Sequence, residues 1–183
     1  MRDRTPSPVR RLAKDQRGLS TIEFAFVGPV LILAYFGLAE LCGAMLAERK
    51  ASHTASAIGD LVAQATSIHD SDISNIFAIG GQIMAPDPST TLGMRISSIQ
   101  ENAAGTSASV AWSDASGTMT ANAVGATMTL PSNLVAANQS IIRADVSYTY
   151  NVPVAYLLPS AFTYTETFYL RPRLVDPIPR VSP

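Results

Sequence analysis

The feature that most constrains this chain is a long apolar run near its N-terminus, bounded by two glutamates. Residues 24–39, FAFVGPVLILAYFGLA, contain no charged side chain, and Glu23 and Glu40 stand at the two ends of the run. A helix between these glutamates is roughly 25 Å long at about 1.5 Å per residue, a little under the ~30 Å hydrocarbon core of a bilayer. The run therefore predicts one membrane-spanning helix, which we place within residues 19–47.

The segment before the run is basic. Residues 1–17 carry six basic and two acidic side chains, a net charge of +4, which leaves seven basic and twelve acidic side chains in the rest of the chain, a net charge of −5. A short basic segment beside a membrane span stays in the cytoplasm, so we expect the chain after the span to be exported. An acidic exported part argues against nucleic acid as a partner.

A cleaved secretory signal is the first alternative to an anchor, because it also has a basic segment before an apolar stretch. The run exceeds the usual ~7–15 apolar residues of such a signal. The nearest approach to its cleavage site is Cys42-Gly43-Ala44. A lipoprotein site at Cys42, the sole cysteine, is disfavoured because Glu40 and Leu41 precede it. These observations favour an anchor.

The residues around Gly18 form a motif with a known counterpart. Arg17–Phe24, RGLSTIEF, resembles the processing site of type IV pilins and pseudopilins, in which cleavage follows a glycine and a glutamate lies at mature position five. The longer run GLSTIEFAFVGPVLILAYFGLAEL resembles the TadE-like family of the tight-adherence (Tad, Flp pilus) machinery. Residues 145–150 and 169–173 are similar to the C-terminal strands of that family. The chain departs from the major-pilin pattern at Leu19, where Phe or Met is usual.

The resemblance implies a TadE- or TadF-like minor pseudopilin, anchored in the bacterial inner membrane with its N-terminus cytoplasmic and its C-terminal domain periplasmic. It implies that a prepilin peptidase cleaves between Gly18 and Leu19. It also implies that other Tad pilus subunits are the partners, in assembly of a type IVb pilus for surface adhesion. The alternative is a membrane-tethered periplasmic binding or adhesin module that is not processed as a pilin. We expect no cofactor.

Glu23 is the candidate for subunit registration. Cleavage after Gly18 would create an α-amine on Leu19, and Glu23 lies about one helical turn further on the same side. An ionised carboxylate at the bilayer centre costs ~2.5–3.5 kcal/mol, and less near the interface, so an amine of this or a neighbouring subunit would relieve the cost. The alternative is a glutamate at the headgroup boundary without such a role. We expect Glu40 at the periplasmic interface.

Helical spacing of apolar residues continues beyond the membrane run to Ile68, which predicts that the helix continues outward as a stalk. Small residues recur every four positions from Ala39 through Gly43 and Ala47, a ladder that lets another helix backbone approach closely. We assign these three residues to helix packing, with chance in an alanine-rich chain as the alternative. Pro29 is expected to kink the helix or loosen one hydrogen bond.

Residues 69–72, HDSD, contain residue types that bind metals, but His53 is the only other histidine. We therefore expect no metal site. A helix cap at Asp70 or Ser71, opening a short helix that ends at Gly80-Gly81, explains the run better.

From Leu92 the apolar period changes to two, which predicts an antiparallel sheet. Its strands are expected from residue 92, over 107–112, over 142–150 and over 162–170, with residues 114–140 irregular. The fold class is α+β: an N-terminal transmembrane helix continues into a periplasmic helical stalk that packs on a small sheet. We expect a leader at 1–18, the transmembrane helix at 19–47, the stalk at 48–85 and the sheet domain at 86–183.

Glu166 falls on the apolar side of the last strand, where we expect a structural carboxylate paired with Arg95 or Arg143. The chain has no hydrolase elbow, zinc-protease, phosphate-loop or CxxC motif, so we expect no enzyme. Catalysis would need chemistry around Asp145, Glu166 or Tyr148.

The connection at residues 152–159 is too apolar for an ordinary surface loop. It is expected either to cover the open end of the core or to present Tyr156, Leu157 and Leu158 to a partner or a membrane surface.

Overall fold

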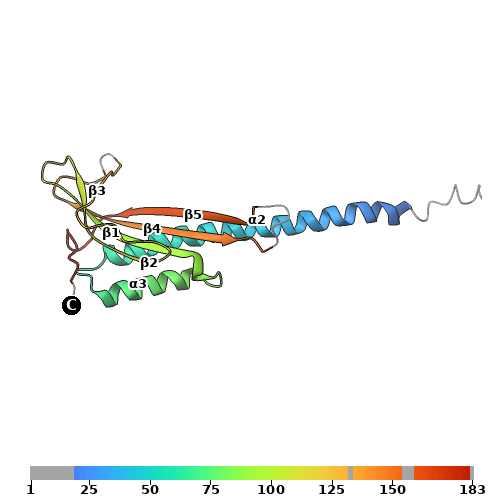
Figure 1. The fold of residues 1–183 in the computed structure, drawn as a ribbon, viewed down its shortest axis with the longest axis horizontal. Helices are drawn as coiled ribbons and strands as arrows, with labels where there is room; N and C mark the ends of the chain where they lie inside the picture. The colour runs from blue at the N-terminus through green and yellow to red at the C-terminus, as the bar shows by residue number, and fades with distance from the viewer. Residues whose placement is uncertain (1–18, 132–133, 154–158, 182–183) are drawn as a thin grey trace, which may run out of the picture.

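The computed structural model describes residues 19–131, 134–153 and 159–181. The described elements are two α-helices, one short 3-10 helix and five strands. Figure 1 shows their arrangement. In chain order they are α2 (Leu19–Ala63), α3 (Asp70–Ile83), η1 (Ser89–Thr91), β1 (Leu92–Glu101), β2 (Ala108–Gly117), β3 (Thr127–Met128), β4 (Ser140–Asn151) and β5 (Ala161–Leu170). The fold is α+β, as predicted.

Helix α2 is continuous over 45 residues, about 67 Å at the usual helical rise. Pro29 lies inside the helix and does not interrupt it. The N-terminal half of α2 projects away from the rest of the chain, whereas its C-terminal half lies along the strands (Figure 1). The predicted continuation of the apolar helix beyond residue 47 is therefore confirmed, although α2 ends at Ala63 and Ile68 lies outside it.

The five strands form one antiparallel sheet in the order β3-β2-β1-β4-β5. The four predicted strands are all present, and the turn between the first two places Gly105 at φ +66. Strand β3 lies in the segment that was expected to be irregular. It has only two residues, which is too short to produce an apolar period.

Both helices cover the same face of the sheet and share one core with it. Alanines at positions 47, 51 and 55 let the α2 backbone approach β4 and β5 closely, and Ile58 and Val62 of the same helix add larger side chains. The central members are Ala47, Ala51, Ala55, Ile58, Val62, Ile96, Ile142, Val146 and Tyr148. The prediction that the helices after the apolar run cover the apolar face of the sheet is therefore confirmed.

Helix α3 differs from the prediction at both ends. Its N-cap is His69, whose backbone N–H donates to Asp72 Oδ2 at 2.9 Å, so the expected cap at Asp70 or Ser71 is wrong. The helix also continues through Gly80-Gly81 to Ile83. Gly80 serves close packing instead of termination, because a Cβ there would lie 2.5 Å from Met94 Sδ on β1.

A buried ion cluster joins three strands on the other face of the sheet. The Asp145 side chain is 2% exposed and accepts bonds from Arg95 Nε (3.0 Å) and Nη2 (2.8 Å), Arg143 Nε (2.9 Å) and Thr167 Oγ1 (2.7 Å). The expected pairing of Glu166 with either arginine is therefore wrong. Strand alternation explains the error, because Glu166 points to the α2 side of the sheet and both arginines point away from it.

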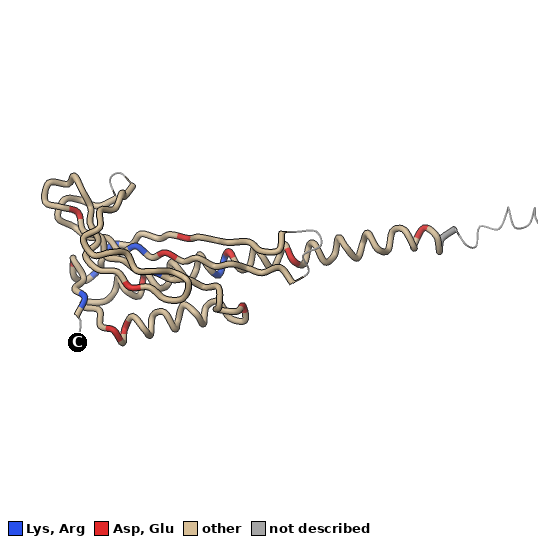
Figure 2. Tube along the Cα trace, viewed as in Figure 1, with Lys and Arg blue, Asp and Glu red and all other residues tan. Residues whose placement is uncertain are grey.

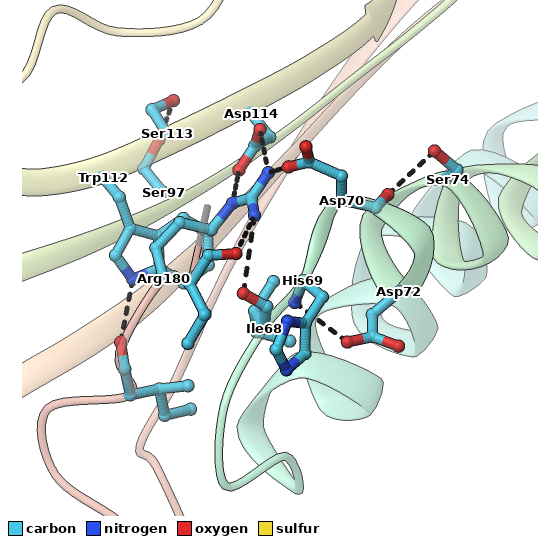
Figure 3. Close-up of polar contacts among 12 residues, drawn as sticks. Ile68, His69, Asp70, Asp72, Ser74, Ser97, Trp112, Ser113, Asp114 and Arg180 are labelled. Atoms are coloured by element: carbon cyan, nitrogen blue, oxygen red, sulfur yellow. Dashed lines mark hydrogen bonds and ion pairs between the residues drawn. The ribbon is translucent and has the colours of Figure 1, made fainter. Parts of the chain in front are cut away.

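The segment after β5 closes the end of the domain far from the projecting half of α2 (Figure 1), where it makes polar contacts with Trp112 and Asp114 of β2 (Figure 3). Ile178 is buried, and its carbonyl accepts a hydrogen bond from Trp112 Nε1 at 2.9 Å. Arg180 binds Asp114 on β2 and Asp70 at the start of α3. The hydrogen bond to Asp114 raises the pKa of this guanidinium, and Asp70 adds to the effect. The segment thus ties α3 to the sheet.

Candidate membrane and assembly helix

The N-terminal half of α2 exposes large apolar side chains all around its circumference. Phe24 and Phe26 are 74% and 76% exposed. The exposed set includes Ile22, Phe24, Phe26, Val27, Val30, Leu31, Ile32, Leu33, Tyr35, Phe36, Leu38 and Leu41. A helix that is apolar on every side is stable only in an apolar surrounding. Lipid, apolar helices of other subunits, or both must therefore surround this half.

Among the residues that the structure describes, one helix is long and apolar enough to cross a membrane. Little of its apolar window is buried, unlike the core helix of a soluble protein. The distance along the helix from Leu19 to Glu40 is about 32 Å, which matches the ~30 Å hydrocarbon core. Figure 2 shows that acidic positions lie only near the two ends of this stretch. The helix is compatible with single-pass anchoring.

Glu23 lies in the second turn of α2 and is exposed. Leu19 is the first residue of the helix, so its backbone lies about one turn from Glu23 on the same side. Gly18 lies outside the described residues. The next basic residue along α2 is Arg49, roughly 39 Å further along the helix. A cation for Glu23 must therefore come from the N-terminal end of the chain or from another molecule.

Glu40 marks the level at which the domain begins to cover the helix. The residue is 7% exposed, and its Oε1 has no hydrogen-bond partner among the described residues. One turn later Ala44 is buried, whereas Leu38 on the N-terminal side is exposed. Glu40 thus separates the projecting half of α2 from the half that packs on the sheet.

The residues assigned to helix packing lie in different surroundings. Ala39 is exposed. Gly43 lies under Tyr150, and a Cβ at position 43 would be 2.5 Å from the tyrosine oxygen. Ala47 is fully buried in the core shared with the sheet. Contact with another helix at these positions stays a prediction, and of the three, Ala39 offers the most accessible surface for it.

The remaining candidate residues lie in the 152–159 connection and in strand β4. Tyr156, Leu157 and Leu158 lie outside the described residues. Asp145 is bound by two arginines, and burial raises the pKa of Tyr148, which keeps its phenol protonated. In the described part of the chain no group of three or more His, Cys, Asp or Glu side chains is placed to hold a metal ion.

Sequence reasoning missed the contacts of Trp112, Asp114 and Arg180. No periodicity or motif indicates these contacts, because Trp112 and Asp114 lie far along the chain from Ile178 and Arg180. The residues meet only when the last segment folds back over the sheet. The prolines at 172, 177 and 179 were the indication that the sequence offered for this segment. Proline is disfavoured in helix interiors and in central strands, so the three residues predict an extended segment after the last strand.

These features define a class of protein: one long helix is apolar on every side over its N-terminal half, and its C-terminal half packs on the sheet of an α+β domain. A family model described as TadE-like protein matches residues 18–59. The match covers the projecting half of α2 and most of the half that packs on the sheet. It confirms the resemblance to the TadE-like family that the sequence predicts, over these residues, and this likeness supports a Tad pilus-associated protein in general. No curated protein and no solved structure matches the chain.

Proposed function

We propose that this protein is a TadE- or TadF-like minor pseudopilin that takes part in assembly of a Tad (Flp) type IVb pilus for surface adhesion. The single observation that carries the proposal is the division of α2 at Glu40. The half before it exposes apolar side chains over the thickness of a bilayer, and the half after it is the spine of the folded domain. One rigid helix therefore connects a membrane-embedded assembly surface to the domain.

The order of events follows from this division. Residues 1–18 form the leader, and a prepilin peptidase removes it between Gly18 and Leu19 at the cytoplasmic face of the inner membrane. The new α-amine of Leu19 then pairs with Glu23 of this or a neighbouring subunit. Helices pack laterally within residues 19–47, and residues 48–85 and 86–183 together form the periplasmic domain. The protein contributes by positioning other subunits, not by catalysis.

Topology gives the first test. A periplasm-active reporter such as alkaline phosphatase, fused after Pro183 of the full chain, is expected to be active, because the +4 segment before the span stays in the cytoplasm. The same reporter fused after Arg17 is the matched control and is expected to be inactive. Activity of a cytoplasm-only reporter at position 183 would contradict the proposed orientation.

A further inference from the structure

Strand β5 forms one edge of the sheet. It pairs with β4 along its whole length, from Asn151↔Ala161 to Ile142↔Leu170, without a shift in register. No described strand pairs with its other side. Strand β5 is ten residues long, contains no proline and carries one charged residue, Glu166. Long regular edges without proline, bulge or several charges are prone to pair with another strand.

The unpaired backbone groups of this edge can be assigned to particular residues. The N–H of Val152 donates to Ser160 O at 3.0 Å, and these two residues continue the β4–β5 register by one step. In an antiparallel pair the hydrogen-bonded positions alternate, so the even-numbered residues of β5 bond to β4. The odd-numbered residues, which include Thr163 and Thr165, therefore direct their N–H and C=O groups outward.

A hollow with uncompensated negative charge lies beside this edge, between α2 and β5. It measures about 340 Å³ and is lined by Met45, Glu48, Arg49 and Ser52 of α2 and by Glu166 of β5. None of its three charged groups makes a salt bridge to another described residue. Two carboxylates against one guanidinium leave a net negative charge. A strand added at the edge would meet this charge on the side that faces α2.

A second copy of this chain fits the edge poorly. Figure 1 shows β5 running along the axis of α2, so antiparallel pairing of two β5 strands would direct the two apolar helix halves in opposite directions, and one membrane could not hold both. In either orientation a second β5 has no lysine or arginine to offer, since Glu166 is its only charge. Charge complementarity therefore favours a different strand with a basic residue.

We propose that the outer edge of β5 accepts an extended strand of a different pilus subunit anchored in the same membrane, and that this strand carries a lysine or arginine beside Glu166. Backbone hydrogen bonds to the odd-numbered residues would supply affinity, and the basic residue would supply selectivity. The proposal rests on the proposed function for the identity of the neighbour, whereas the accepting edge follows from the strand itself.

Photo-crosslinking of the full chain, in cells that assemble the pilus, tests the proposal. With p-benzoylphenylalanine at position 163, we expect an adduct whose mapped peptide lies in an extended segment that contains a lysine or arginine. Thr165→Pro removes one outward N–H and leaves the bonds to β4, so the adduct is expected to fall about tenfold. Thr165→Val keeps this N–H and is the matched control, with less than a roughly twofold change expected.

Glu166→Lys provides a second variant that leaves the backbone unchanged. It is expected to reduce the adduct, and exchange of the mapped basic residue for glutamate in the partner is expected to restore it. An adduct with a second copy, no adduct, or an adduct equally strong in the Thr165→Pro protein would overturn the proposal. A third outcome separates this proposal from the proposed function. If Thr165→Pro keeps wild-type co-purification and piliation while Glu23→Gln loses both, strand addition at β5 is wrong and the proposed function stands.

Discussion

Glu23→Gln is expected to leave the protein processed and inserted but to weaken strongly its association with other pilus subunits. The amide keeps the size and hydrogen bonding of glutamate and removes the charge that would pair with an α-amine. Insertion should become easier, since an ionised glutamate costs ~2.5–3.5 kcal/mol at the bilayer centre. Loss of a pair worth about 2 kcal/mol weakens association more than tenfold. Co-purification from detergent-solubilised membranes and counts of surface pili measure the effect.

Glu40→Gln is the matched control for this experiment, because it makes the same chemical change on the same helix. One Glu40 oxygen already lacks a hydrogen-bond partner among the described residues, so loss of the charge there is expected to leave association unchanged. If the Glu23→Gln protein assembles as well as wild type, Glu23 is only an interface residue. If it loses both cleavage and stability, its role is in folding.

Asp145→Ala is expected to cause the largest loss of stability in the sheet domain. The carboxylate is almost fully buried and accepts hydrogen bonds from Arg95, Arg143 and Thr167, so its removal leaves two guanidinium groups without their partner. Breaking a buried ion pair costs ~3–5 kcal/mol. Because the arginine side chains are 20% and 22% exposed and can regain water, we expect a loss near the lower end, about 3 kcal/mol.

Urea unfolding of the full chain in detergent measures this loss as a decrease in the free energy of unfolding. Asp60→Ala is the control, because the Asp60–Arg173 pair lies at the surface, with side chains 35% and 58% exposed. Such pairs contribute only ~0.2–1 kcal/mol. Equal effects of the two substitutions would show that the Asp145 cluster adds no more than a surface ion pair.

The helix and the main strands could be predicted because each has a local signal. The apolar run identifies α2, helical spacing carries it outward, and alternation from Leu92 identifies β1 and the strands that follow. A local signal was misleading at Gly80, because glycine is typical both of helix ends and of close packing between elements. Gly80 suggested a helix end, but its small size serves contact with Met94 instead.

Contacts between distant segments could not be predicted from the sequence. The partner of Arg95 depends on which strands are neighbours and on their register, and only the order β1-β4-β5 brings Asp145 and Thr167 beside it. Arg180 likewise meets Asp114 only after the last segment folds back. The hypothesis of processing at Gly18 and subunit registration at Glu23 needs no contact between distant segments, because it rests on the spacing of these two residues along the chain.

The intact mass of the protein extracted from membranes tests the central claim most directly. In cells with an active prepilin peptidase, the account predicts the mass of residues 19–183, with Leu19 as the new N-terminus. Gly18→Leu is expected to block cleavage and to give the full-length mass in the same membrane fraction. A wild-type mass that corresponds to an N-terminus near Ala44, or to the uncleaved chain, would contradict the pseudopilin account.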